Sequence, residues 1–252
     1  MWFWNKKKTI AASGIMQGAV DHHSHILPGV DDGVETMDEA LRILATYETL
    51  GIKELWLTPH IMEDIPNSPE KLRARFAELK AAYSGNIELH LAAEYMIDNH
   101  LYQLLQDSHS EPKGENSANT LLPIGAKGNH LLVETSFFSK PMRLMEMLEL
   151  IKSKGFHPLL AHPERCMYLD NADYTKLHSQ GVKFQLNLAS LAGGYGKAAK
   201  KKAEWLLLNG LYTVAGSDLH CEEGLKYFTE CQLSKQTIEQ VWKLLTKHFF
   251  NS

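Results

Sequence analysis

The sequence predicts an α/β protein folded as a parallel (β/α) barrel of about seven repeats. Seven short apolar runs alternate with helix-like segments, and a glycine precedes most of the runs, as expected where a helix ends. A chain of 252 residues with 44% hydrophobic and 22% charged residues has the size and composition at which such barrels form one domain. We therefore expect a single barrel domain over residues 19–252.

The apolar runs have the length and spacing of buried parallel strands. The first is residues 19–23 (AVDHH), and the fourth is residues 130–134 (HLLVE). The other five each follow a glycine: Gly51 before 53–58, Gly85 before 87–93, Gly155 before 157–161, Gly181 before 183–188 and Gly210 before 212–216. Short apolar runs bounded by turn formers are typical of strands covered on both faces.

The segments between the runs carry signals for helix starts. Thr36, with Glu39 three residues later, has the pattern of a capping box. Ser68 followed by Pro69 is typical of an N-cap and the first helical residue. These helices would connect consecutive strands, and such alternation favours a parallel sheet.

One connection differs from the others. Residues 108–120 (SHSEPKGENSANT) are polar and rich in turn formers, so we expect a protruding loop that ends in a small hairpin around residues 121–130. Because this loop leads into the N-terminal end of a strand, we expect it on the barrel face away from the strand C-termini.

Charge and cysteine content exclude several classes of function. The formal net charge is −4, from 26 basic and 30 acidic residues, which disfavours binding to a nucleic-acid backbone. The three cysteines form no CxxC pair, and so few indicate a reducing compartment such as the cytoplasm. No arginine stands six residues after any of them, so the Cys-x5-Arg loop of cysteine-dependent tyrosine phosphatases is absent.

Residues 1–18 resemble neither a signal peptide nor a membrane span. Their apolar stretch is short and is interrupted by Ser13, Gly14 and Gln17. We expect a flexible N-terminal tail. The alternative is weak contact with a membrane surface or a partner, through Trp2 and Trp4 and the three lysines that follow.

Polar residues at the ends of the apolar runs carry the main functional signal. Strand C-termini of a parallel barrel converge at one mouth, so residues distant in sequence can meet there. Histidines and carboxylates, the usual ligands of Zn, Mn and Fe, stand at six of the seven ends. They are His23, His25, His60, Glu94, Glu134, His162, Asp218 and His220, and Asn187 stands at the remaining end.

Asp32 is a ninth candidate ligand, although the sequence Asp31-Asp32-Gly33 also suits a simple turn. With Asp32, the set offers five histidines and four carboxylates, more than one tetrahedral metal site uses. Two or three divalent ions, bridged by a carboxylate and a hydroxide, fit better. Such clusters activate water at neutral pH and clamp the oxygens of a phosphoester.

Arg165 is a candidate for binding phosphate. It stands three residues after His162, and the alternative is a surface ion pair with Glu164. Phe137, Phe138 and Met62 follow the same strand ends, where they either flank an aromatic substrate ring or anchor loops in the core. From these residues alone, the sequence predicts phosphoester hydrolysis.

Five motifs together resemble the PHP (polymerase and histidinol phosphatase) superfamily. They are residues 23–33 (HSHILPGVDDG), 58–60 (TPH), 93–95 (AEY), 161–165 (AHPER) and 216–220 (GSDLH). Within that superfamily they are similar to the bacterial protein-tyrosine phosphatases of capsule and exopolysaccharide systems, the CpsB/YwqE type. The resemblance extends from about Val20 to Leu225.

The resemblance implies a distorted (β/α)7 barrel with three divalent metal ions, usually manganese, at its C-terminal mouth; Fe, Zn or Mg are alternatives. It implies one metal bound by His23, His25, Glu94 and Asp218, a second that shares Glu94 and adds Glu134 and His162, and a third bound by Asp32, His60 and His220. It also implies that Arg165 binds phosphate. The implied substrate is phosphotyrosine on a protein, such as the C-terminal tail of a bacterial tyrosine autokinase.

The chain departs from this pattern at one point. Some relatives carry a second arginine where this chain has Leu225, and the neighbouring Lys226 is a candidate replacement. Two alternatives to a tyrosine phosphatase stay open from sequence. One is a small-molecule phosphatase of the histidinol-phosphate type, and the other is a non-catalytic, metal-stabilised regulator that binds the kinase.

Overall fold

The computed structural model describes residues 7–107, 121–125 and 127–246. The curled parallel sheet of the barrel consists of β2 (Val20–Asp21), β3 (Glu54–Leu57), β4 (His60–Ile61), β5 (Glu88–Leu91), β6 (Glu94–Met96), β7 (His130–Glu134), β8 (His157–Ala161), β9 (Lys183–Asn187) and β10 (Val214–Gly216). Each of the seven predicted strands is present. The second and third predicted runs contain β3 and β5, and each is followed by a further short strand, β4 or β6, that was not predicted.

The strands form two sheets, which together make up the wall of the barrel. One has the order β10-β9-β8-β7-β6-β4 and the other the order β2-β3-β5, and all pairs within them are parallel. Backbone hydrogen bonds join the segments that follow β2 and β10, from Asp218 N–H to the His23 carbonyl (2.8 Å) and from His25 N–H to the Leu219 carbonyl (2.9 Å). The predicted barrel architecture is confirmed.

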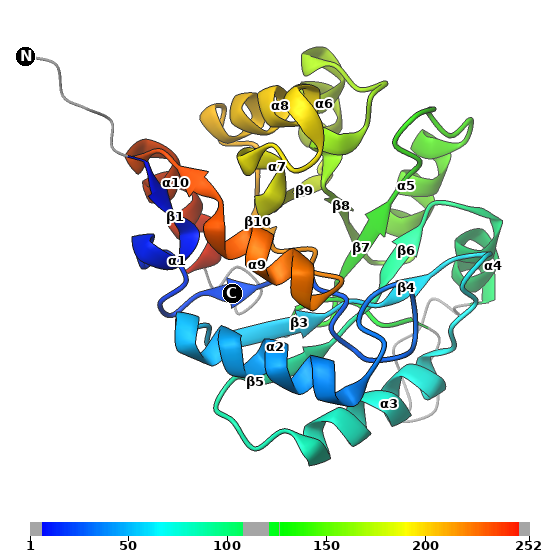
Figure 1. Cartoon of the computed structure of the whole chain (residues 1–252). Coiled ribbons are helices and arrows are strands. Elements are labelled where there is room, and N and C mark those ends of the chain that lie inside the picture. Colours follow the sequence, from blue (N-terminus) through cyan, green and yellow to red (C-terminus); the bar gives the residue numbers. More distant parts are fainter. Residues whose placement is uncertain (1–6, 108–120, 126, 247–252) are drawn as a thin grey trace, which may run out of the picture.

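Helices surround the curled sheet on its outer side (Figure 1). They are α2 (Met37–Leu50), α3 (Pro69–Ala82), α4 (Asn99–Asp107), α5 (Leu144–Ser153), α6 (Asn171–Ser179), α7 (Leu188–Ala192), α8 (Gly196–Leu208), α9 (Glu222–Glu230) and α10 (Lys235–Leu245), with a 3₁₀ turn, η1, at Pro163–Arg165. None of these helices, within the part of the chain described, combines the length and apolar character needed to cross a bilayer.

Two helix starts follow the predicted capping chemistry. The Thr36 hydroxyl accepts a hydrogen bond from Glu39 N–H (3.2 Å), and the Ser68 hydroxyl accepts one from Lys71 N–H (3.2 Å). The capping box at Thr36 is only half formed, because the Glu39 carboxylate accepts a hydrogen bond from Glu222 N–H at the start of α9 instead. Glu39 therefore joins α2 to α9.

The apolar residues pack on both sides of the sheet. One large cluster fills the space between the sheet and the helices. A second cluster contains residues that alternate with the first along the strands, so it occupies the barrel interior. Its members are Val20, Trp56, Ala92, Ile124, Leu132, Leu159, Ala161 and Val214. The barrel is thus a filled core that supports the residues at its mouth.

The expectation of a flexible tail over residues 1–18 is wrong for residues 8–16. Lys8–Thr9 form β1, which pairs antiparallel with β11 (Gln232–Leu233), and α1 (Ile10–Ser13) follows directly. Ile10, Ile15 and Met16 are buried in the main core, since this segment covers apolar surface near α9. The aromatic residues Trp2 to Trp4 lie outside the described residues.

The predicted hairpin before the fourth strand is present. Ile124 forms an antiparallel bridge with His130, with a hydrogen bond from Ile124 N–H to the His130 carbonyl of 2.8 Å. The polar loop predicted at 108–120 lies outside the described residues.

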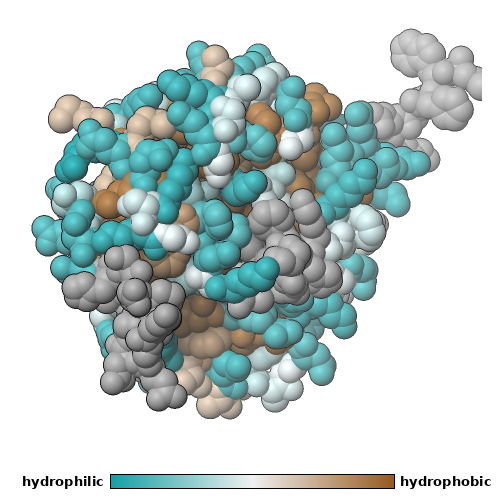
Figure 2. All heavy atoms as spheres, turned by 180° about the vertical axis from the view of Figure 1, so that it is seen from behind, coloured by the Kyte–Doolittle hydropathy of each residue, from teal (hydrophilic) through white to brown (hydrophobic). Residues whose placement is uncertain are grey.

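On the face opposite that of Figure 1, hydrophilic side chains dominate, with smaller hydrophobic areas between them (Figure 2).

Candidate metal centre

His23 and His25 follow β2 and are fully buried at the barrel mouth. They are two residues apart, so both rings point to the same side of the extended segment, and their Nε2 atoms lie 3.1 Å apart. His25 Nδ1 lies 2.8 Å from Asp31 Oδ2. Burial would lower the pKa of His25, but Asp31 and Glu94 raise it well above its usual value.

The two aspartates of the 31–33 turn have different roles. The Asp31 side chain is buried, pairs with His25 and accepts a hydrogen bond from His60 N–H (3.0 Å), so it orients both histidines. The Asp32 side chain is 64% exposed and reaches toward His60 and His220, with its Oδ1 at 3.5 and 3.7 Å from their Nε2 atoms. The arrangement agrees with Asp32, not Asp31, as the candidate ligand.

Gly33 allows this turn to close. A Cβ added at Gly33 would lie 2.2 Å from the His25 carbonyl oxygen, which leaves no room for a side chain. The close approach permits a hydrogen bond from Val34 N–H to the same carbonyl (3.0 Å). Any larger residue at position 33 would move the turn that carries Asp32.

Glu94, the first residue of β6, lies at the centre of the cluster. Its Oε2 is 3.1 Å from His23 Nε2 and 3.3 Å from His25 Nε2, and its Oε1 is 3.0 Å from His162 Nε2. Burial alone would raise the pKa of Glu94, but the surrounding histidines hold it well below its usual range. A carboxylate in this position can bridge two cations.

Glu134 ends β7 beside His60. Its Oε1 lies 3.3 Å from His60 Nδ1, and both side chains are buried. Burial raises the pKa of Glu134 well above its usual value, and the nearby carboxylates of Glu94 and Asp218 raise it further. Buried carboxylates this close together indicate that the site is built to receive positive charge.

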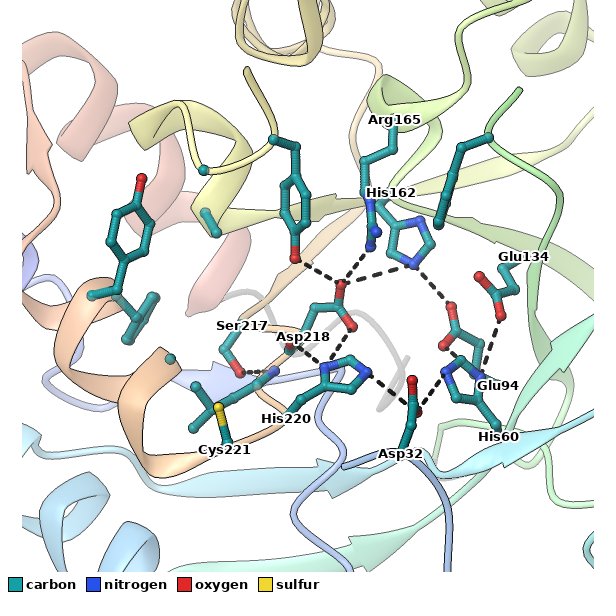
Figure 3. A pocket seen from close by; sticks show the side chains of 18 of the residues that line it. Asp32, His60, Glu94, Glu134, His162, Arg165, Ser217, Asp218, His220 and Cys221 are labelled. Carbon is teal, nitrogen blue, oxygen red and sulfur yellow. Dashed lines mark hydrogen bonds and ion pairs between the residues drawn. The ribbon is translucent and has the colours of Figure 1, made fainter. Parts of the chain in front are cut away.

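Asp218 follows β10 and connects the histidines to Arg165. Its Oδ1 lies 3.4 Å from His23 Nε2, while its Oδ2 accepts hydrogen bonds from Arg165 Nη1 (3.0 Å) and Asn187 Nδ2 (2.7 Å). Burial opposes ionisation of Asp218, but the surrounding histidines, His23 foremost, lower its pKa to about 2. Figure 3 shows Asp218 between Arg165, His162 and His220.

All nine predicted ligands therefore come together at the mouth of the barrel. Within 4.8 Å of one another, their donor atoms form three groups: His25, Asp32, His60 and His220; His23, Glu94, His162 and Asp218; and His60, Glu94 and Glu134. His25 Nε2 also lies 3.3 Å from Glu94 Oε2 and 3.5 Å from Asp218 Oδ1, so these distances are compatible with the ligand sets that the family resemblance implies.

The chemistry of these donors fits divalent cations. His60 Nδ1 is buried and makes no hydrogen bond among the described residues, although two carboxylate oxygens lie 3.3 and 3.4 Å away. Imidazole nitrogens and carboxylate oxygens converge here, and there are too few N–H groups to give each of these acceptor atoms a hydrogen bond. Such a set is unfavourable alone and suits ions that accept both nitrogen and oxygen ligands.

Several supporting residues have no clear signal in the sequence. Gln185 Oε1 lies 3.0 Å from His23 Nδ1 and accepts a hydrogen bond from His162 N–H (3.1 Å). Asn187, which carried no assigned role, donates to Asp218. Both lie on β9 two residues apart, so they share a face, and this alternation is the one signal that points to Gln185.

The surface ion pair between Arg165 and Glu164 does not form. Glu164 is buried, accepts hydrogen bonds from Tyr212 Oη (2.9 Å) and Asn187 N–H (3.0 Å), and has a pKa raised to about 7 by burial. Arg165 points instead toward Asp218 and lines the cavity.

A cavity of about 540 Å³ opens over the cluster. Of the three apolar residues predicted near the mouth, Met62 and Phe137 line it, whereas Phe138 is 80% exposed and does not. Among the described residues that line the cavity, Arg165 is the only lysine or arginine. Lys226 is exposed on α9 and is not a lining residue.

The cysteines do not form a nucleophilic centre. Cys166 is buried, and burial raises its pKa to about 12, which suppresses the thiolate. Cys221 lines the cavity but has Tyr227 six residues later, and Cys231 is buried. The site's chemistry therefore rests on its histidines and carboxylates.

Fold and site together define a barrel protein with a multi-ligand centre at its strand C-termini. Residues 19–240 match the family of capsular polysaccharide synthesis proteins, CpsB/CapC. The chain belongs to this family, as the motifs predicted.

Individual relatives agree with this assignment. The tyrosine-protein phosphatase YwqE of Bacillus subtilis (strain 168) is 26% identical over 215 residues, which cover 84% of this chain and 81% of that protein. The tyrosine-protein phosphatase CpsB of Streptococcus pneumoniae is 26% identical over 209 residues, which cover 80% of this chain and 82% of that protein.

A solved structure supports the fold. It comes from the crystal structures of YwqE from B. subtilis and CpsB from S. pneumoniae, described as unique metal-dependent tyrosine phosphatases. It matches with a TM-score of 0.72 and 22% identity, covering 92% of this chain and 90% of that one. The barrel architecture is therefore common to both.

Proposed function

We propose that this protein is a metal-dependent protein-tyrosine phosphatase of a capsule or exopolysaccharide system. The observation that carries the proposal is the convergence of nine histidine and carboxylate donors with one arginine under an open cavity. Family membership and the phosphatase names of the relatives support the same activity.

The nine donors are the proposed ligands of up to three divalent ions. Glu94, which approaches histidines with both of its oxygens, is the proposed bridging ligand. When bound, such ions would lower the pKa of a water molecule and offset the negative charge of a phosphoryl group. Manganese is the ion expected from the resemblance, and Fe, Zn and Mg are the ones to compare with it.

Arg165 is the proposed phosphate-binding residue. Its guanidinium is held beside Asp218 at the edge of the metal centre, and it offers planar N–H groups suited to phosphate oxygens. Of the ligands, His162 and Asp218 are the proposed catalytic residues. Arg165 follows His162 by three residues and donates a hydrogen bond to Asp218.

The walls of the cavity suit an aromatic substrate. Phe137, Tyr195, Tyr227 and Phe228 line it, together with Met62. A phenyl ring that packs beside these side chains would bury apolar surface that a serine phosphoester lacks. This difference is the physical basis for proposing phosphotyrosine as the substrate.

The proposed partner is a protein that carries phosphotyrosine in an exposed segment, such as the tail of a bacterial tyrosine kinase. An exposed segment is needed because seven of the nine donor residues are buried below the cavity. The proposed compartment is the cytoplasm, where the described free cysteines would stay reduced.

The test compares phosphate release from a phosphotyrosine peptide, a phosphoserine peptide and histidinol phosphate, with metal content measured on the same sample. We expect the highest kcat/KM with phosphotyrosine and loss of activity on chelation. A preference for histidinol phosphate would indicate a small-molecule phosphatase instead. No release by fully metal-loaded protein would indicate the non-catalytic regulator.

Ligand variants connect this activity to the site. Asp218→Ala should lose bound metal and phosphate release together, because it removes a central donor. Asp38→Ala, on the exposed face of α2, is the matched control and should keep both. Full activity in protein from which all metal has been verifiably removed would exclude the proposed mechanism.

A further inference from the structure

The Arg165 guanidinium is flanked by two aromatic rings. Its Cζ lies 4.0 Å from the ring centroid of Phe137 and 4.0 Å from that of Tyr195. The two rings come from separate connections, Phe137 from the segment after β7 and Tyr195 from the loop between α7 and α8. Two rings at this distance hold a cation by electrostatic attraction and by packing.

Glycines allow the Tyr195 loop to reach this position. Gly193 and Gly196 have positive φ angles of 93° and 86°, which other residues rarely adopt. A Cβ at Gly194 would lie 3.1 Å from the Tyr227 ring and 3.2 Å from the Ala189 carbonyl. The sequence Gly193-Gly194-Tyr195-Gly196 therefore places one large ring in a loop whose backbone packs closely against the cavity wall.

The Tyr195 ring is fixed at its polar end. Its hydroxyl accepts a hydrogen bond from Asn187 Nδ2 (3.2 Å) and lies 3.5 Å from Asp218 Oδ2. A phenol keeps its proton at neutral pH, so the hydroxyl can donate toward Asp218. Asn187 and Asp218 thus anchor the ring that contacts Arg165.

Phe137 is fixed by contacts of its own loop, the segment after β7. The Phe137 backbone carbonyl accepts a hydrogen bond from Met167 N–H (2.7 Å), which joins this loop to the segment after η1. Its ring also makes an edge contact with His162, at 5.6 Å between centroids. Phe137 therefore contacts both the proposed phosphate-binding residue and a proposed metal ligand.

We propose that Phe137 and Tyr195 form an aromatic clamp that positions Arg165 for phosphate binding. The proposal rests on the proposed function of this site. An unrestrained arginine side chain has many rotamers, and fixing it before substrate arrives avoids that entropy loss during binding. The need is strong here, because no second arginine or lysine lines the described cavity.

The test uses variants that separate the ring from the hydroxyl. Tyr195→Leu removes the aromatic face, whereas Tyr195→Phe keeps it, and Phe137→Leu removes the second ring. We expect each leucine variant to bind inorganic phosphate about 5- to 30-fold more weakly, the range of one desolvated cation–π contact. Tyr195→Phe should stay within about 3-fold of the wild type, because the ring is retained.

The readouts distinguish positioning from general damage. Metal content should be unchanged in all three variants, and KM for the phosphotyrosine peptide should rise more than kcat falls. Phe138→Leu is the matched control, because Phe138 is adjacent in sequence but 80% exposed and outside the cavity lining. Equal losses in Tyr195→Phe and Tyr195→Leu would assign the effect to the hydroxyl and overturn the clamp.

A double-mutant cycle tests whether the rings act through Arg165. In the Arg165→Ala background, Tyr195→Leu should cause no further loss of phosphate affinity, since the cation that the ring contacts is gone. Additive losses would overturn the proposal. Phosphate affinity is measured by calorimetry on metal-loaded protein, so the clamp stays testable even if the wild type releases no phosphate from phosphotyrosine, an outcome that would contradict only the proposed function.

Discussion

His162 and Asp218 are the two non-glycine residues in the described chain with positive φ, at 32° and 54°, and their side chains approach to 4.0 Å. L-residues avoid this conformation because the Cβ comes too close to the following carbonyl. Hydrogen bonds of their backbone N–H groups hold both residues in this conformation. His162 N–H donates to Gln185 Oε1 (3.1 Å), and Asp218 N–H donates to the His23 carbonyl (2.8 Å). Backbone strain of this kind collects at functional sites.

We predict that metal-free His162→Gly is more stable than metal-free His162→Ala by about 1 kcal/mol, although both lack the imidazole ring. The emptied space differs only by the Cβ, which alanine retains in the strained conformation. Urea unfolding in chelator measures the difference. Lys176, an exposed residue inside α6, is the matched control, and there alanine should be more stable than glycine by a similar amount. The same order at both positions would show that strain at His162 is negligible.

Arg165→Ala should separate substrate binding from metal binding. We predict unchanged metal content and a fall in kcat/KM of roughly 10²- to 10³-fold, because one charge-assisted contact to phosphate stabilises the transition state by about 3–4 kcal/mol. Lys226→Ala should stay within about 2-fold, since Lys226 is exposed and does not line the cavity. Equal effects of the two substitutions would place Lys226 in the site as well.

The barrel was predictable because its strands and helices carry strong local signals. Glycine stops and short apolar runs located all seven strands, and Ser68-Pro69 located the start of α3. The N-terminal segment was missed because its order depends on distant contacts. Residues 8–9 are too short to show strand periodicity, and they form a strand only by pairing with Gln232–Leu233.

The members of the candidate site were predictable, but not every contact that supports them. Strand topology brings the eight strand-end donors together, whereas the approach of Asp32 to His60 and His220 depends on how the 31–33 turn folds back over the mouth. Supporting contacts were least visible. Glu164 follows His162 closely and resembles a surface acid in sequence, yet Tyr212 and Asn187 hold it in the core.

We predict that Glu134→Gln raises the stability of the metal-free protein but lowers the amount of metal that the protein binds. Without metal, burial raises the pKa of the Glu134 carboxyl, and the carboxylates of Glu94 and Asp218 raise it further. The neutral amide removes this repulsion, so we expect the metal-free Tm at pH 8 to rise by about 2–4 °C, equivalent to about 1 kcal/mol in a chain of this size. The same substitution should lower the metal content, because it removes an anionic ligand.

Glu146→Gln, on the exposed surface of α5, provides the comparison for this result. It removes one carboxylate far from buried acids and should leave both the metal-free Tm and the metal content unchanged. A fall in metal-free Tm for Glu134→Gln would show that the ion contacts of this carboxylate, with His60 for example, outweigh its repulsion by Glu94 and Asp218.

His130, at the start of β7, should make folding sensitive to acid independently of the metal centre. Burial, together with the charges of His157 and Lys183, lowers its pKa to about 4. Above pH 6.5 the residue is neutral whether folded or unfolded and contributes nothing. Between pH 6.5 and 4 only the unfolded chain takes up the proton, so stability falls as the pH falls.

We predict that His130→Gln, which cannot titrate, flattens the fall in urea midpoint between pH 7 and 4.5 for chelated protein. An unchanged slope would mean that His130 is protonated in the folded state.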